Sequence, residues 1–162
     1  MATVAISPDH DTIHGEMFIA APPARVFQAL TDPQQMPLWW GQREMYRVTK
    51  FESDVRPGGK WKSVGVNAKG ETFEVGGEYL EVDPPHLLVQ TWIASWSGTL
   101  ATKVRWELQT QEDGTVVRIT HSGFAGNVSA ANDHTQGWQR VLSWLSSYAE
   151  KGQTIETRPD KF

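Results

Sequence analysis

Cysteine is missing from all 162 positions of the chain. Its absence excludes disulfides, thiolate metal sites and cysteine nucleophiles, and it fits a reducing cytosol, although a cysteine-free secreted protein would look the same. Long apolar runs are missing too, because no segment approaches the roughly 18 apolar residues of a membrane span. Residues 1–10 have neither the basic start nor the apolar stretch of a signal peptide. We therefore expect a cytoplasmic protein that does not insert into a membrane.

Positive charge is scarce and dispersed. The 15 lysines and arginines are outnumbered by 19 aspartates and glutamates, which gives a formal net charge of −4 at pH 7. Because a nucleic-acid partner is usually bound by a concentrated basic surface, we do not expect one here.

Motifs of several enzyme and metal-binding classes are also missing. The chain has no G-x-S-x-G nucleophile elbow and no phosphate-binding glycine loop. His10 and His14 would suit a metal ion if they lay on a helix, but their segment is typical of a tail that runs into a strand. We expect neither a metal ion nor a cofactor.

Tryptophan, in contrast, is abundant. The eight tryptophans are Trp39, Trp40, Trp61, Trp92, Trp96, Trp106, Trp138 and Trp144. Large aromatic side chains either fill the core between a sheet and a helix or line an apolar ligand cavity, and one residue can do both.

The end of the chain carries the strongest periodic pattern. Large or apolar residues recur with the 3.6-residue period of an α-helix over residues 131–150, and Gly152 is well placed to end it. The stripe consists of His134, Trp138, Val141, Leu142, Leu145, Tyr148 and Ala149. Such a helix must bury its stripe against a sheet, and a cavity can remain between the two layers.

The preceding segments are typical of strands, with period 2 and turn residues between them. We expect a first strand over residues 11–20 and short helices over 24–30 and 33–38. Further strands are expected over 45–53, 60–67, 71–82, 86–94, 99–109 and 115–122, with a bulge or bend at Gly76-Gly77. This order predicts a single α+β domain over residues 11–152, a flexible tail over 1–10 and a C-terminal tail over 153–162.

Several short motifs follow one another in a specific order. They are IAAPPARVFQALTDP (19–33), LWW (38–40), RPGGKW (56–61), GEYLEV (77–82), PHLLVQTW (85–92), THSGF (120–124) and GW (137–138). Together with the order of elements, these motifs resemble the START-like helix-grip superfamily, also called the Bet v-like, SRPBCC or polyketide-cyclase-like superfamily. Within it, the chain looks most like the bacterial homologues of the activator of the heat-shock-protein-90 ATPase.

The resemblance implies a helix-grip fold, in which a curved antiparallel sheet of six to seven strands wraps around the long C-terminal helix. Two short helices follow the first strand, and an internal cavity lies between the layers. The activity stays open, because members of this superfamily bind lipids, sterols or polyketides, act as cyclases or oxygenases, or serve as chaperone partners.

Strand alternation predicts which side chains face the cavity. Trp106 lies on an apolar face that alternates with charged residues, the same logic places His121 inward, and we favour the face of Gln90 and Trp92 on their strand. The predicted ligand-binding residues are Trp40, Trp61, Gln90, Trp92, Trp106, His121, Phe124, His134, Trp138 and Val141.

His121 and His134 are the candidate polar groups of this set. If both face the cavity, they could orient a ligand oxygen or act as acid and base near neutral pH. The alternative is that they are histidines satisfied by backbone groups. We assign no catalytic residue, and His121 is the candidate.

These features favour a small cytosolic domain that binds a hydrophobic or aromatic small molecule between sheet and helix, oriented by Gln90 and His121. One alternative is an enzyme of the polyketide cyclase or hydrolase type that uses His121. Another is a chaperone-interacting protein, which is less favoured because eukaryotic activators carry an additional N-terminal domain where this chain has a short tail. A homodimer through a strand edge or the Trp39-Trp40 segment is compatible with the sequence.

Overall fold

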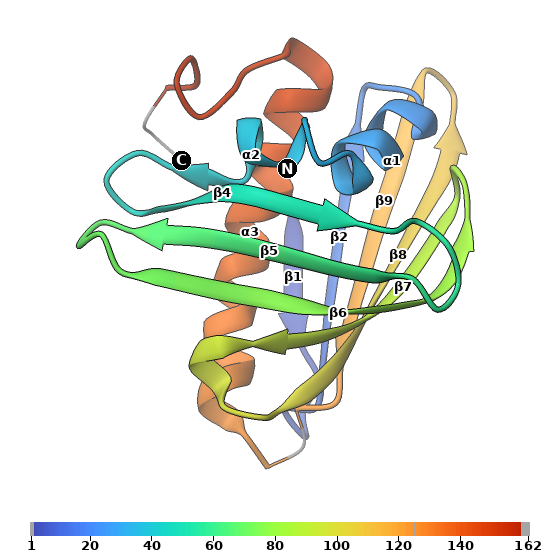
Figure 1. Ribbon diagram of the computed structural model, residues 1–162. Coiled ribbons are helices and arrows are strands. Elements are labelled where there is room, and N and C mark those ends of the chain that lie inside the picture. Colours follow the sequence, from blue (N-terminus) through green and yellow to red (C-terminus); the bar gives the residue numbers. More distant parts are fainter. Residues whose placement is uncertain (1, 125, 160–162) are drawn as a thin grey trace.

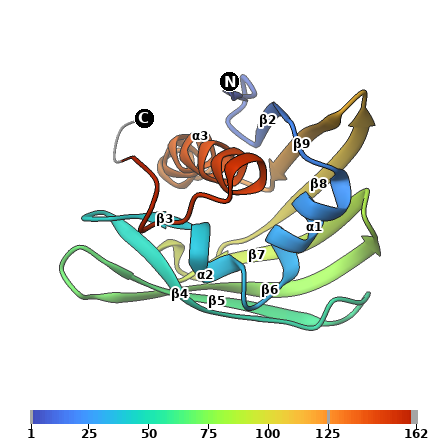
Figure 2. The same ribbon diagram turned by 90° about the horizontal axis from the view of Figure 1, so that it is seen from above.

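One long helix and a strongly curved antiparallel sheet make up most of the protein. The computed structural model describes residues 2–124 and 126–159. Helix α3 (Val128–Lys151) runs along the concave side of the sheet, and the short helices α1 (Pro23–Thr31) and α2 (Met36–Trp39) lie at one end of it (Figures 1 and 2). This arrangement confirms the predicted α+β helix-grip fold. Within the described residues, no helix combines the length and the apolar character needed to cross a membrane.

The described residues form a single sheet of nine antiparallel strands in the order β1-β2-β9-β8-β7-β6-β5-β4-β3. The strands are β1 (Thr3–Ile6), β2 (Thr12–Ile19), β3 (Gly41–Gln42), β4 (Tyr46–Ser53), β5 (Lys60–Asn67), β6 (Thr72–Asp83), β7 (Leu87–Ala94), β8 (Ala101–Gln111) and β9 (Gly114–Ser122). A short 3-10 helix, η1 (Ser95–Ser97), leads from β7 towards β8.

The sheet has more strands than the six to seven expected, because two very short strands extend its edges. Within the segment 1–10, predicted as a tail, Thr3–Ile6 forms β1 and pairs with β2. Val4 and Ile6 pack against the core, which explains why this segment joins the sheet. At the other edge, Gly41–Gln42 pairs with the start of β4.

The segment after α3 also packs on the domain, although residues 153–162 were predicted as a tail. Ile155 is buried, and the guanidinium of Arg158 donates hydrogen bonds to the main-chain oxygens of Trp39 and Gly41. Arg158 also lies over the ring of Trp144, with its guanidinium carbon 5.3 Å from the ring centroid. Residues 153–159 therefore cover a side of α3 that would otherwise meet solvent; the prediction extends beyond the described residues at 160–162.

Helix α3 has the ends and the buried face that its sequence indicates. The side-chain oxygen of Asn127 accepts a hydrogen bond from the Ala130 amide at 3.0 Å and so caps the first turn. Gly152 ends the helix with a φ of 67°, a conformation that glycine adopts without steric cost. All seven residues of the predicted stripe are buried, which confirms it.

The pairing of β6 with β7 contains a local irregularity. A Cβ atom on Gly77 would lie 2.2 Å from the main-chain oxygen of Thr91, so only glycine fits there. Next to it, the Glu78 amide donates to Thr91 Oγ1 at 2.8 Å instead of to a ladder carbonyl. The register shift itself lies between Tyr79 and Glu81, slightly beyond the predicted position. Irregularities of this kind bend a strand locally, and beyond this one the sheet continues through β5, β4 and β3 around α3 (Figure 2).

Candidate functional site

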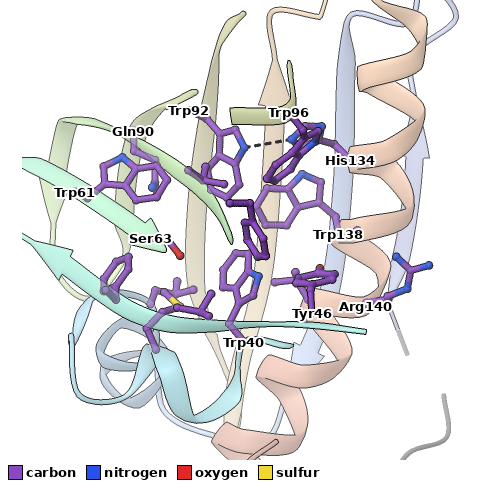
Figure 3. A pocket seen from close by; sticks show the side chains of 18 of the residues that line it. Trp40, Tyr46, Trp61, Ser63, Gln90, Trp92, Trp96, His134, Trp138 and Arg140 are labelled. Atoms are coloured by element: carbon purple, nitrogen blue, oxygen red, sulfur yellow. Dashed lines mark hydrogen bonds between the residues drawn. The ribbon is translucent and has the colours of Figure 1, made fainter. Parts of the chain in front are cut away.

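A cavity of about 390 Å³ lies between the inner face of the sheet and α3 (Figure 3). Strands β4 to β8, η1, α2 and the first half of α3 supply its walls. This volume falls within the usual range of small-molecule sites, roughly 300–1,000 Å³. Within the part of the chain that the structure describes, no group of three or more acidic, histidine or cysteine side chains could hold a metal ion.

Tryptophan rings form the largest part of the cavity wall. Trp92 on β7 is central, with its ring centroid 5.2 Å from that of Trp61 on β5 and 5.3 Å from that of Trp138 on α3. Trp106 meets Trp138 edge-on at 5.5 Å, and Trp40 meets it edge-on at 6.0 Å. These tilted and edge-on contacts are the arrangements that aromatic quadrupoles favour, so the rings form a rigid wall.

Two histidines lie within or behind this wall, and their hydrogen bonds fix their tautomers. Trp138 Nε1 donates to His121 Nδ1 at 2.9 Å, so the proton of a neutral His121 lies on Nε2, which is 2.6 Å from Thr102 Oγ1. The Thr102 hydroxyl in turn donates to the main-chain oxygen of Trp92. Every donor and acceptor of the His121 ring is therefore satisfied by the protein.

His134 also accepts an indole N–H, but it does so at Nε2, whereas His121 accepts at Nδ1. Trp92 Nε1 donates to His134 Nε2 at 3.2 Å, as the dashed line in Figure 3 marks, and His134 Nδ1 lies 2.8 Å from the Ala130 oxygen. The Nδ1 atom therefore carries the proton of the neutral ring. The two imidazole rings are 5.0 Å apart and perpendicular, so the network joins α3, β7, β8 and β9.

Burial keeps both imidazoles neutral. The pKa of His121 lies well below its usual value of 6.5, first because the ring is desolvated and then because His134 is close. Desolvation also lowers the pKa of His134, and this effect is opposed by the Ala130 carbonyl and the nearby Asp133. Neutral rings match the network, because each accepts one indole N–H.

The mouth of the cavity has a different character from its interior. Trp96 on η1 lines the cavity but is 52% exposed; its ring stacks on His134 and meets Phe73 edge-on. Tyr46 continues this aromatic rim, and burial raises its pKa to about 12 against the opposing effect of Arg140, so its hydroxyl is neutral. The charged lining residues, Asp133 and Arg140, both lie on α3.

The structure brings most of the predicted ligand-binding residues together around the cavity. The residues that line it are Trp40, Trp61, Gln90, Trp92, Trp106, His134, Trp138 and Val141. His121 and Phe124 do not line it. Their rings lie 4.5 Å apart, and both pack against His134, so they support the wall from behind.

The residues that line the cavity on β4, at the start of β6 and on η1 were not predicted from the sequence. The unpredicted aromatic residues among them are Tyr46, Phe51, Phe73 and Trp96. Period-2 alternation on β4 and β6 would have been a signal for Tyr46 with Val48, and for Phe73 with Val75. No comparable signal exists for Trp96, because its position depends on the turn after β7.

The curved sheet, the long helix and the cavity between them define a helix-grip protein of the START-like type. Residues 20–150 match the family described as Activator of Hsp90 ATPase homolog 1-like protein, and the chain belongs to this family. A search of curated proteins found no match to the chain.

Solved structures with the same fold come from several bacteria. Protein CV1439 from Chromobacterium violaceum is 26% identical, with a TM-score of 0.75 over 86% of this chain and 97% of that chain. Protein Ms6760 from Mycobacterium smegmatis is 19% identical, with a TM-score of 0.79 over 93% and 98%. CalU16 from Micromonospora echinospora is 21% identical, with a TM-score of 0.65 over 94% and 85%. The last two are similar in fold alone.

Proposed function

We propose that this protein is a cytosolic binding domain that takes a hydrophobic or aromatic small molecule into the cavity between sheet and α3. The observation that carries the proposal is the cavity itself, which has a ligand-sized volume of about 390 Å³ and walls made largely of aromatic rings. A preformed apolar pocket with few polar groups is the usual architecture of a small-molecule site.

The expected affinity follows from the size of a ligand that such a cavity can enclose. A ligand of about 12 non-hydrogen atoms that gains roughly 0.5 kcal/mol per atom would bind with about 6 kcal/mol, which corresponds to a Kd on the order of 40 μM. The tryptophans that line the cavity would report binding directly, because a bound aromatic molecule contacts several of them.

The two alternatives have less support. An acid–base enzyme at His121 would need a ring nitrogen that a ligand can reach, but both nitrogens of His121 are engaged and the residue is fully buried. A chaperone partner is suggested by the family description, and the large exposed hydrophobic residues, among them Phe18, Leu80 and Trp96, come from different elements. Neither alternative is supported by a feature as direct as the cavity.

The test is a titration of the protein with flat aromatic molecules and fatty acids, followed by tryptophan fluorescence and thermal unfolding together. Saturable quenching with a matching rise in Tm is expected, because a ligand that binds only the folded state stabilises it. The variant Ser63→Phe fills the cavity from β5 and should weaken binding at least tenfold. Val64→Phe is the matched control, because neighbouring strand residues point to opposite faces.

Two outcomes would contradict the proposal. The first is a flat response of the wild-type protein across the whole panel. The second is equal binding by the folded Ser63→Phe and Val64→Phe variants, which would locate the ligand outside the cavity. In the first case a protein partner becomes the better hypothesis.

A further inference from the structure

A buried amide side chain interrupts the aromatic wall of the cavity. Gln90 lies on β7, is only 6% exposed and lines the cavity, with its label beside Trp61 and Trp92 in Figure 3. Its strand neighbours across the ladder are Tyr79 on β6 and Val104 on β8. Within residues 2–124 and 126–159, no group forms a hydrogen bond to the Gln90 side-chain amide, and its polar atoms are not among the fully enclosed unpaired ones, so they border the open space of the cavity.

An amide in this position has no partner within the described part of the protein, whereas most polar side chains at this depth have one. Leucine or methionine would fill the same space without a polar group to satisfy. The amide of Gln90 can offer two N–H donors and a carbonyl acceptor into the cavity, and it can turn to present either.

Two indole N–H groups beside Gln90 are already occupied. Trp61 Nε1 donates to the Thr91 oxygen at 3.1 Å, and Trp92 Nε1 donates to His134. Gln90 is therefore a deeply buried polar side chain of the wall whose hydrogen-bonding groups can bind a ligand, and the indole N–H of Trp106 is a second donor without a partner among the described residues.

The charges around the cavity restrict the ligand further. Its charged lining residues, Asp133 and Arg140, both belong to α3, where Asp133 is exposed and Arg140 half-buried. No cation or anion among the described lining residues lies on the β7 side, so an ionised group placed beside Gln90 would lose its hydration without a counter-charge.

We propose that the cavity takes an uncharged, flat aromatic molecule that carries a hydroxyl or carbonyl group, and that Gln90 hydrogen-bonds this group. The inference rests on the proposed function and adds to it the chemical class of the ligand. Edge-on and stacked contacts with Trp92 and Trp61 would hold the rings, and the amide would select aromatic molecules with a polar substituent over plain hydrocarbons.

The probes are a matched pair, naphthalene and 2-naphthol, titrated into the wild-type protein and into Gln90→Leu. The measured quantity is the ratio of the naphthalene Kd to the 2-naphthol Kd, because this ratio cancels the packing of the shared rings. We expect the ratio to fall about 3- to 10-fold in Gln90→Leu, which is the size of one hydrogen bond. Gln136→Leu, at an exposed position of α3, is the matched control and should leave the ratio unchanged.

A second measurement does not depend on a variant that folds. In the wild-type protein, the ¹⁵N–¹H signals of the Gln90 side-chain amide should shift more with saturating 2-naphthol than with saturating naphthalene. 1-Naphthoate, the charged probe, should bind at least tenfold more weakly than 2-naphthol.

The outcomes separate the two proposals. If both probes bind with the same Kd ratio in wild-type and Gln90→Leu protein, the cavity is a binding site and the role of Gln90 is overturned. Equal shifts of the Gln90 amide with both probes, or tight binding of 1-naphthoate, would also overturn the inference. If neither probe binds the wild-type protein, the proposed function fails together with it.

Discussion

The tryptophans of this protein differ from one another at the scale of the single residue. Trp138 and Trp92 each donate an indole N–H to a buried histidine, and Trp61 donates to a main-chain oxygen. Trp106 is equally buried, but none of the hydrogen bonds of the described residues involves its indole nitrogen. The indole N–H groups of these similarly buried rings therefore differ in their hydrogen bonds, and a list of buried apolar residues would not show this difference.

The substitution Trp138→Phe tests the indole–imidazole bond. It keeps an aromatic ring but leaves His121 Nδ1 without its donor at 2.9 Å, in a site closed to water. A buried acceptor left unsatisfied costs about 1–3 kcal/mol beyond the loss of packing. Urea unfolding should therefore show a larger loss of unfolding free energy for Trp138→Phe than for Trp106→Phe. The second variant is a matched control, because both residues are 2% exposed and lose the same ring volume. Equal losses would show that the bond contributes nothing measurable.

At the scale of the element, two register shifts interrupt the part of the sheet that curves around α3, one between β4 and β5 at Val48/Lys50 and one between β6 and β7 at Tyr79/Glu81. Strand pairing alone would continue the sheet smoothly, but the Gly77 position brings the two strands closer than any side chain allows. Strands β4 and β5, which carry several lining residues, lie on the far side of the curved sheet below α3, as Figure 2 shows for the ribbon. Gly77 pairs with Trp61 and lies against Thr91, whose sequence neighbours Gln90 and Trp92 line the cavity, so this backbone feature adjoins the cavity wall.

We predict that Gly77→Ala destabilises the protein by more than about 2 kcal/mol, because the new Cβ would clash with the Thr91 carbonyl, which belongs to the backbone and cannot move alone. Gly137→Ala on α3 is the counterpart. Its Cβ would meet nothing within 4 Å, so replacing glycine in a helix interior should stabilise the protein by roughly 0.5–1 kcal/mol. Thermal and urea unfolding measure both changes. Losses of equal size in the two variants would refute the close-approach argument.

Elements whose pattern repeats over many residues could be predicted from the sequence, and features that depend on contacts between distant segments could not. The stripe of α3 repeats over many residues and was located correctly, whereas β1 and β3 have only four and two residues, too few for a pattern. Alternation gave the right face for Trp106, which lines the cavity. It also placed His121 inward, but alternation gives the face and not the depth, and Trp138 separates His121 from the cavity. Trp96 and Phe73 meet because the pairing of β6 with β7, in which Val75 lies opposite Ala94, continues into the turn after β7.

At the scale of the whole molecule, the two histidines connect parts of the chain that are far apart in sequence. The network runs from the Ala130 carbonyl through His134 to Trp92, and from Thr102 through His121 to Trp138. It fastens α3 to the centre of the sheet at the cavity wall. Its two accepting nitrogens face indole N–H donors, so a proton added to either ring would replace an attraction with a repulsion between two donors.

This arrangement predicts that the protein loses stability in mild acid. The pKa values of His121 and His134 in the folded protein lie below 6.5, mainly because of burial. In the unfolded chain both rings take up protons near pH 6.5, so lowering the pH favours the unfolded state. The stabilisation is complete above about pH 7 and is lost as the pH falls below 6.5, by up to about 1.4 kcal/mol per pH unit for each ring.

Urea unfolding between pH 7.5 and pH 5.5 measures the slope of the free energy of unfolding against pH. His134→Gln keeps an oxygen that can accept the Trp92 N–H but removes one titrating ring, so its slope should be smaller than that of the wild-type protein. His14→Gln, which removes an exposed imidazole from β2 outside the network, is the matched control. If His134→Gln retains the wild-type slope while His14→Gln reduces it, the acid sensitivity arises outside the buried network, and the neutral histidines do not couple α3 to the sheet through their protonation state.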